Sequence, residues 1–240
     1  MDITKYTKPA RKLLPLRRCG AVIVAAGSAS RMGGIDKVMA PLKGEPMIVH
    51  TVRAFQTCDA ISEIVIVTRG DLILPITQLT NGFDKVTAVV LGGSSRQESV
   101  ANGMNALSDK CKLAAIQDGA RPLVTWQLID RVVRAAHAHN AAIPVIPVKD
   151  TIKVCNSALV VNTPDRATLR AVQTPQVFDF DPLRGALKKA AEDGAEVTDD
   201  CSAVERLGMS VRIVEGDERN LKVTTPLDLK LAEMLMEENL

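Results

Sequence analysis

One stretch near the start of the chain decides the fold: AVIVAAGSASRMGG, at residues 21–34. The residues Ala21–Ala26 are apolar and predict a buried strand, and a run of mostly small residues follows, with Arg31 among them. Small side chains let backbone N–H groups approach an anion closely, and loops after parallel strands lie where such sheets bind ligands. We therefore expect a parallel sheet whose first loop binds a phosphate-bearing ligand. The alternative is an ordinary strand-to-helix turn with solvated charges.

This loop fits neither of two common nucleotide-binding motifs. It lacks the GxGxxG pattern of NAD-binding domains, which opposes a plain dinucleotide-binding fold, and it lacks the Gly-Lys-Ser/Thr ending of a P-loop. Two cations, Arg31 and Lys37, lie within one short stretch and suit a ligand with several phosphates better than a single carboxylate. The loop therefore predicts a phosphate site of another kind.

The composition is that of a globular protein. The length of 240 residues suits one α/β domain, and 46% hydrophobic with 24% charged residues excludes disorder over most of the chain. Aromatic residues make up only 2%, so aliphatic side chains must build the core. Aromatic stacking platforms for single-stranded nucleic acid are thereby excluded, and we expect no nucleic-acid partner.

Apolar runs alternate with segments of helical period, which predicts an α/β fold with a parallel sheet wound by helices. Besides the first strand, we expect strands at residues 63–68, 86–91, 113–117, 141–148 and 210–215. We expect helices at residues 46–58, 71–83, 95–108, 126–140, 181–194, 198–208 and 226–238. Thr198 is expected to cap the helix at 198–208.

The βα rhythm is interrupted after Val148. Short β-like runs at 151–154 and 159–162, joined by a turn at 155–158, predict a protruding β-arm at about residues 149–165. The apolar run Ala158–Val161 has no core to enter within one subunit, so we expect a second subunit to cover it.

The first 18 residues form a basic segment, which we expect to be a flexible, solvated extension; an interaction arm is the alternative. Residues 19–240 are then expected to form a single domain. No apolar run is long enough for a signal peptide or a membrane span, so we expect no membrane association and a cytoplasmic location. Five scattered cysteines without a CxxC pair argue against structural zinc and a disulfide framework.

Two further loops resemble ligand-binding segments. Gly92-Gly93-Ser94-Ser95-Arg96 follows the third strand, although a capped helix start would explain it too. Asp118 ends the fourth strand, where a carboxylate beside a bound polyphosphate is a natural anchor for Mg²⁺; a simple turn is the alternative. All three loops are expected at one edge of the sheet. His50, His137 and His139 fall away from these loops, which argues against a histidine metal site or a catalytic triad.

The chain resembles the 2-C-methyl-D-erythritol 4-phosphate cytidylyltransferases, within the sugar-phosphate nucleotidyltransferases. The resemblance spans roughly residues 19 to 236. It rests on the three loops and on three more specific motifs: Val148-Lys149-Asp150-Thr151, Thr174-Pro175-Gln176 and Asn220-Leu221-Lys222-Val223-Thr224.

The resemblance implies a Rossmann-like, mostly parallel sheet of the nucleotide-diphospho-sugar transferase type. It also implies a homodimer whose subunits exchange their β-arms. The implied reaction is transfer of a cytidylyl group from CTP to the methylerythritol phosphate, with release of pyrophosphate. It implies Mg²⁺ bound by Asp118, and stabilisation of the pentacoordinate phosphorus by Arg31 and Lys37. Thr151 and Arg166 from the partner subunit, with Lys222 from the same one, would bind the acceptor. The nucleotide would contact Ala25, Ala26, Gly27, Gly93, Ser94, Ser99, Asp118, Gly119 and Arg121.

Two departures from the family pattern stand out. Asp36-Lys37-Val38 replaces the usual Pro-Lys-Gln, so that an acid beside Lys37 could change its reach or charge balance. Gly119 replaces an alanine and is expected to enlarge or loosen the pocket near the nucleotide. The sequence leaves two alternatives open: a cytidylyltransferase for another polyol phosphate such as ribitol 5-phosphate, and a nucleotide-binding regulatory module without turnover.

Overall fold

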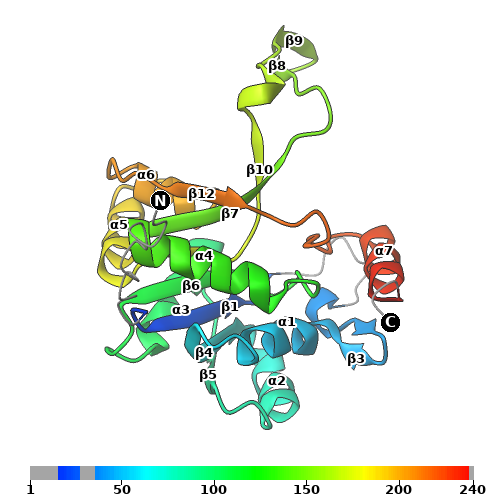
Figure 1. Ribbon diagram of the computed structural model, residues 1–240, viewed down its shortest axis with the longest axis vertical. Helices are drawn as coiled ribbons and strands as arrows, with labels where there is room; N and C mark the ends of the chain where they lie inside the picture. Colours follow the sequence, from blue (N-terminus) through cyan, green and yellow to red (C-terminus); the bar gives the residue numbers. More distant parts are fainter. Residues whose placement is uncertain (1–15, 28–35, 238–240) are drawn as a thin grey trace, which may run out of the picture.

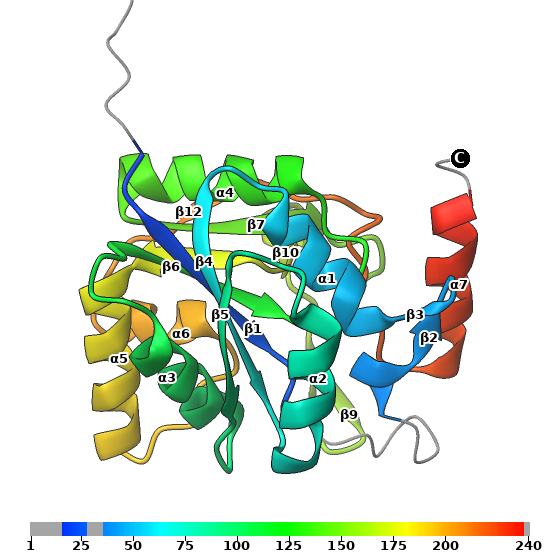
Figure 2. The same ribbon diagram turned by 90° about the horizontal axis from the view of Figure 1, so that it is seen from below.

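A computed structural model describes residues 16–27 and 36–237. Its centre is an eight-stranded sheet with strand order β10-β7-β11-β6-β1-β4-β5, and β12 pairs with β7 (Figures 1 and 2). The strands are β1 (Cys19–Val24), β4 (Ile61–Thr68), β5 (Val86–Leu91), β6 (Leu113–Asp118), β7 (Ala141–Pro147), β10 (Arg170–Val172), β11 (Gln176–Asp179) and β12 (Arg212–Glu215). The predicted α/β class with a mostly parallel sheet is confirmed.

Helices cover both faces of this sheet. They are α1 (Met47–Gln56), α2 (Ile73–Thr80), α3 (Arg96–Ala106), α4 (Trp126–His139), α5 (Phe180–Glu192), α6 (Asp200–Glu205) and α7 (Pro226–Glu237). Helices α1, α2 and α4 pack on one face, and α3, α5 and α6 pack on the other (Figure 2). Each expected helix is present, with ends that differ from the expected ones by up to three residues.

Strand alternation divides the core into two layers. Ala21 and Ile23 of β1 point toward α1 and α4, whereas Val22 between them points toward α3 and α5. In β4, Ile66 packs in the layer with α1 and α4, and Val67 packs in the layer with α3 and α5. Both faces of these strands are buried, which is why each strand is a continuous apolar run.

The predicted strands at 86–91 and 113–117 are confirmed within one residue, but the antiparallel strand β11 was not expected. It lies between β6 and β7 and pairs with both. Its four residues, Gln-Val-Phe-Asp, are too few to establish a period, and they are buried by the two neighbouring strands and by helices α4 and α5. A second expectation was wrong at α6: Asp199, not Thr198, caps the helix, because its carboxylate accepts the N–H of Ser202 at 2.9 Å.

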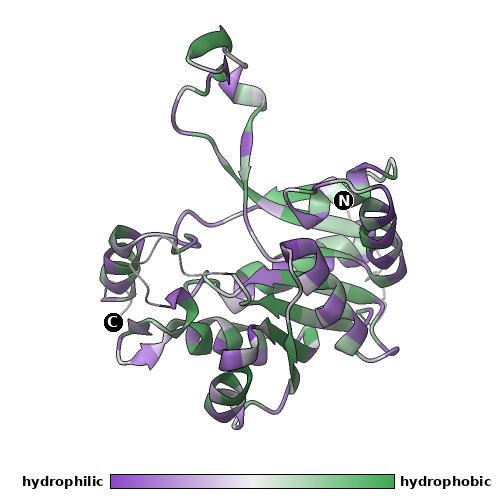
Figure 3. Cartoon of the chain, turned by 180° about the vertical axis from the view of Figure 1, so that it is seen from behind, coloured by the Kyte–Doolittle hydropathy of each residue, from purple (hydrophilic) through white to green (hydrophobic). Residues whose placement is uncertain are grey.

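The β-arm projects from the body of the molecule (Figure 1). Its hairpin consists of β8 (Val154–Asn156) and β9 (Leu159–Asn162), so the first run begins three residues later than expected. The turn is shorter than expected too, with Ser157 in the left-handed region at φ 53°. Leu159 and Val161 are exposed by 75% and 65%, and the tip of the arm is visibly apolar (Figure 3).

Three 3-10 turns and one short hairpin complete the description. The 3-10 turns are η2 (Lys37–Met39), η3 (Gly70–Leu72) and η4 (Arg166–Thr168), and a short hairpin is formed by β2 (Pro41–Leu42) and β3 (Glu45–Pro46).

Arg17, which the sequence assigns to the basic extension, contacts the body: Nη1 lies 2.5 Å from the Asp179 carboxylate, and Nη2 donates to the Ala136 carbonyl at 2.7 Å. No helix within the described ranges is long and apolar enough to cross a bilayer.

Candidate active site

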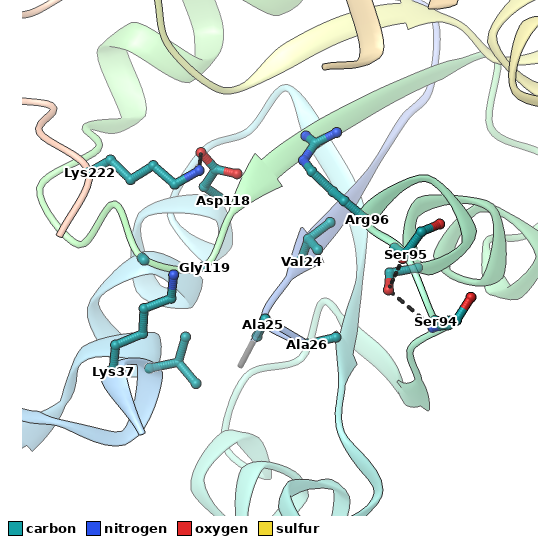
Figure 4. Close-up of a pocket in the computed structure, with 15 residues that line it drawn as sticks. Val24, Ala25, Ala26, Lys37, Ser94, Ser95, Arg96, Asp118, Gly119 and Lys222 are labelled. Atoms are coloured by element: carbon teal, nitrogen blue, oxygen red, sulfur yellow. Dashed lines mark hydrogen bonds and ion pairs between the residues drawn. The ribbon is translucent and has the colours of Figure 1, made fainter. Parts of the chain in front are cut away.

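The site lies at the carboxyl ends of neighbouring strands, and backbone hydrogen bonds hold these ends together. Ala25 donates its N–H to Val67 at 2.7 Å, and Gly119 donates to Val24 at 2.8 Å. The three loops expected from the sequence therefore meet at one edge, around a cavity of about 340 Å³ (Figure 4). Its volume is within the range of small-molecule sites.

The first loop contributes Ala25, Ala26 and Gly27 to the cavity wall. Lys37 also lines the cavity, and its Nζ lies 4.0 Å from where a Cβ at Gly27 would be. A side chain at Gly27 would therefore approach the ammonium group. Residues 28–35 lie outside the described residues, and with them Arg31.

The second loop is folded tightly onto the start of α3. A Cβ at Gly93 would lie 2.2 Å from Cγ of Glu98, so only glycine fits without displacing that side chain. Gly93 donates its N–H to the Ser99 hydroxyl at 3.1 Å, and Ser94 donates both its N–H and its hydroxyl to Glu98 at 2.7 Å. Gly93, Ser94 and Ser99 all line the cavity as expected. Both the backbone N–H and the hydroxyl of Ser94 are therefore already paired with Glu98.

Asp118 brings a buried carboxylate to the cavity. Its Oδ2 lies 3.0 Å from Nζ of Lys222 and 3.4 Å from Nε of Arg121. Burial alone would raise the pKa of Asp118, but the positive charges of Lys222, Arg121 and Arg96 outweigh burial and hold this pKa below its usual value. The carboxylate is therefore ionised at neutral pH.

Arg96 is a site residue that was not among the expected binding residues, although the family pattern includes it. It lines the cavity and pairs with Asp200, its Nη2 lying 2.6 Å from Oδ2 of that residue. Asp200 is 1% exposed, and its other carboxylate oxygen has no hydrogen-bond partner among the described residues. Burial raises the pKa of Asp200, and Arg96 opposes this effect. The two residues are 104 positions apart, so sequence spacing could not indicate the pair.

A buried amide network supports Asp118 from below the cavity. Its backbone N–H donates to the Thr174 hydroxyl at 3.1 Å, and Asn220 donates to the Thr174 carbonyl at 2.9 Å. Arg121 does not line the cavity; its Nη1 donates to the Asn220 carbonyl at 2.6 Å. Arg121 thus links Asp118 to the segment that carries Lys222.

The donor set can be tested against Mg²⁺. Within the described ranges, no group of three or more His, Cys, Asp or Glu side chains could hold a metal alone. Asp118 provides one ionised carboxylate. Both of its ion pairs use Oδ2, so Oδ1 is the oxygen that could bind a cation. Mg²⁺ commonly takes one or two carboxylates together with substrate phosphates. The residues fit a magnesium ion that arrives with a nucleotide.

A family model described as 2-C-methyl-D-erythritol 4-phosphate cytidylyltransferase matches residues 19–238. The chain belongs to this family. The curated cytidylyltransferase of Symbiobacterium thermophilum is 47% identical over 219 residues, covering 90% of this chain and 92% of that protein. The one from Caldanaerobacter subterraneus subsp. tengcongensis is 42% identical over 221 residues, covering 90% and 97%.

Solved cytidylyltransferase structures share the fold. The 4-diphosphocytidyl-2C-methyl-D-erythritol synthase of Anaerococcus prevotii superposes with a TM-score of 0.83 at 28% identity, covering 92% of this chain and 96% of that one. The cytidylyltransferase of Thermus thermophilus gives a TM-score of 0.75 at 33% identity, covering 90% and 98%.

One departure from the cytidylyltransferase pattern lies where β1 and α1 approach closely. A Cβ at Gly119 would lie 3.0 Å from the Val24 carbonyl oxygen and 3.1 Å from Cδ1 of Ile48. Gly119 also lines the cavity. That it enlarges or loosens the pocket near the nucleotide stays a prediction.

At the other departure, the acid Asp36 has two partners of its own, Val38 and Arg69. Asp36 accepts the N–H of Val38 at 3.1 Å and so caps η2, and its Oδ2 lies 2.5 Å from Nη1 of Arg69. Val38 is 2% exposed and packs in the core. Both departures therefore have local structural partners in this member of the cytidylyltransferase family.

The expected acceptor-binding residues divide between two places. Lys222 lines the cavity. Thr151 and Arg166 lie on the β-arm, both are exposed, and Nη1 of Arg166 donates to the Lys149 carbonyl at 2.8 Å. Neither lines the cavity of its own chain. His50 has a structural partner, the Leu42 carbonyl at 2.8 Å.

Proposed function

We propose that this protein transfers the cytidylyl group of CTP to 2-C-methyl-D-erythritol 4-phosphate. The products are 4-diphosphocytidyl-2-C-methyl-D-erythritol and pyrophosphate, in the non-mevalonate route to isoprenoid precursors. One observation carries the proposal: the small-residue loop, the Gly-Ser loop and the Asp118–Lys222 pair line a single cavity in a chain of this family.

The reaction needs positioning and charge neutralisation more than proton transfer. A phosphate oxygen of the acceptor attacks the α-phosphorus of CTP, and the bond to the bridging oxygen breaks as pyrophosphate leaves. The attacking oxygen is already anionic, so no strong general base is required. Among the described residues, Lys37, Arg96 and Lys222 bring positive charge to the cavity wall, where it stabilises the charge that builds up during transfer.

The roles of individual residues follow from this chemistry. Lys37, with Arg31, would stabilise the pentacoordinate phosphorus, and Lys222 would bind the acceptor phosphate. The backbone at Ala25, Ala26 and Gly27, with Gly93 and the hydroxyl of Ser99, would bind the nucleotide. Asp118 would hold Mg²⁺, which would neutralise phosphate charge when bound.

We also propose a homodimer in which the β-arm of one subunit completes the site of the other. Thr151 and Arg166 would then reach the acceptor across the interface. Their exposure, and that of Leu159 and Val161, supports this assembly. The reaction would take place in the cytoplasm. Five free cysteines, four of them buried, suit that reducing compartment.

The deciding experiment is an acceptor panel. Purified protein is incubated with CTP, Mg²⁺ and either methylerythritol phosphate or ribitol 5-phosphate, and pyrophosphate release is followed with mass spectrometry of the product. We expect efficient release only with methylerythritol phosphate. Preference for ribitol 5-phosphate would establish a different polyol specificity. CTP binding without release for either acceptor would favour a regulatory module.

A further inference from the structure

Arg69 links the turn before Lys37 to the end of strand β4. Its Nη1 lies 2.5 Å from Oδ2 of Asp36, while Oδ1 of Asp36 accepts the N–H of Val38 at 3.1 Å. The Asp36 side chain is only 15% exposed. The Asp36 carboxylate therefore caps η2 and connects the start of this turn to Arg69, the residue that follows strand β4.

Arg69 is itself held in place by a second acid. Its Nε and Nη2 donate to the two carboxylate oxygens of Asp71, at 3.1 and 2.9 Å. This bidentate geometry orients the guanidinium group, whose Nη1 then lies beside the Asp36 carboxylate. The Asp71 side chain is 65% exposed, which makes it the solvent-facing partner of the arginine.

The position of Asp36 makes its charge important. It directly precedes Lys37, which lines the cavity proposed to bind a triphosphate. An uncompensated carboxylate there would repel phosphate groups and attract the Lys37 ammonium group away from them. Paired with Arg69, the same carboxylate fixes the turn, and the guanidinium group offsets part of its negative charge beside the cavity.

We propose that Arg69 is a positioning residue for Lys37: by pairing with Asp36, it fixes the turn that carries the lysine and offsets part of the acid's charge beside the phosphate site. The inference rests on the proposed function, because that function makes Lys37 a phosphate-binding cation. It also explains how this chain accommodates an acid where the family pattern has proline.

Steady-state kinetics with CTP test the charge part of this proposal. We expect Arg69→Ala to lower kcat/KM for CTP by about tenfold, mainly through KM, because Asp36 then repels the triphosphate. The double variant Asp36→Asn with Arg69→Ala should recover most of this loss, since position 36 then carries no charge beside the phosphate site and asparagine still caps the turn. Arg69→Gln, which keeps a long polar side chain, is measured alongside.

Arg134→Ala is the matched control. It removes another surface arginine from an ion pair, in which Nε lies 2.6 Å from Asp130, and should retain the parent's kcat/KM within about twofold, as expected for an exposed ion pair. Asp71→Asn weakens the contact that orients Arg69 and should give a loss smaller than that of Arg69→Ala. If Arg69→Ala matches Arg134→Ala, or if the double variant recovers nothing, the proposal is wrong.

A ligand-free measurement keeps this inference separate from the proposed function. Reductive ¹³C-methylation labels the lysines, and the Lys37 signal is assigned by its loss in Lys37→Arg. We expect this signal to move in Arg69→Ala and to return toward the parent position in the double variant. An unmoved signal would overturn the positioning role even if the enzyme is active. A parent protein that releases no pyrophosphate would overturn the proposed function, while the signal would still report on Arg69.

Discussion

Lys37 is the residue on which the proposed chemistry depends most, because its ammonium group lies beside the small-residue loop at the cavity. We expect Lys37→Ala and Arg31→Ala each to lower kcat by about a hundredfold or more, since preorganised charge on a developing oxyanion contributes ~3 kcal/mol. Nucleotide affinity, measured by calorimetry, should fall less than the rate. A Lys37→Ala enzyme with more than about half of the parent rate would contradict this role.

Asp118 is expected to determine the metal requirement. Asp118→Asn should raise the Mg²⁺ concentration needed for half-maximal activity, because an amide is a poorer ligand for a hard cation than a carboxylate. Asp130→Asn, which changes an acid on α4 outside the cavity, is the control. A metal titration that gives the same midpoint for parent and Asp118→Asn would remove Asp118 from the metal site.

The lowered pKa of Asp118 also predicts the direction of a pH effect on stability. A carboxylate whose pKa is lower in the folded state stabilises that state above its unfolded pKa and loses this contribution as pH falls through the folded value. Urea unfolding should therefore show parent more stable than Asp118→Asn at neutral pH. The difference should shrink below about pH 4. A difference that grows in acid would contradict the ion pairing with Lys222 and Arg121.

At the scale of elements, helix α3 approaches the sheet through a glycine. A Cβ at Gly103 would lie 2.3 Å from Cγ1 of Val22 and 2.6 Å from Cγ2 of Val67, so strands β1 and β4 leave no room for a methyl group. We expect Gly103→Ala to lower the free energy of unfolding by about 1–3 kcal/mol, through overpacking. Because α3 carries Arg96 and Ser99 to the cavity, CTP affinity should fall as well.

Gly185 provides the matched control for this substitution. It lies within helix α5, and a Cβ there would meet nothing within 4 Å. Gly185→Ala should raise the free energy of unfolding by about 0.5–1 kcal/mol, because alanine restricts the unfolded chain and favours the helix. Urea titrations of both variants decide the matter. Equal effects at the two positions would show that helix propensity, and not the close packing of α3, determines the outcome.

For the whole molecule, the question is whether one site needs two chains. Mixing an Arg166→Ala subunit with a Lys37→Ala subunit should restore one intact site per hybrid dimer, because the two changes then fall in the same defective site. With random pairing about half of the dimers are hybrids, so activity should approach roughly a quarter of the native rate. No recovery after proven subunit exchange would assign Arg166 to its own subunit, and a monomer in sedimentation would contradict the shared site.

The local sequence was sufficient to predict the sheet class, most strands, and the loops at one edge of the sheet. A buried strand is a short apolar run, and α4 showed its stripe of Ile129, Val132 and Val133 at helical spacing. Both signals lie within a few adjacent residues. For the same reason the sequence alone could place Ala25, Gly93 and Asp118 at one cavity, since each comes directly or closely after a strand.

Only the tertiary structure determined which distant residues meet. Strand β11 is buried because β6 and β7 flank it, and the sequence of four residues does not contain that information. Asp200 pairs with Arg96 only because α6 and α3 pack on the same face, and Asp36 reaches Arg69 only because η2 lies beside the end of β4. The space at Gly119 likewise depends on Val24 and Ile48. Such contacts join residues far apart in the chain, and their geometry arises only when the strands are ordered in the sheet.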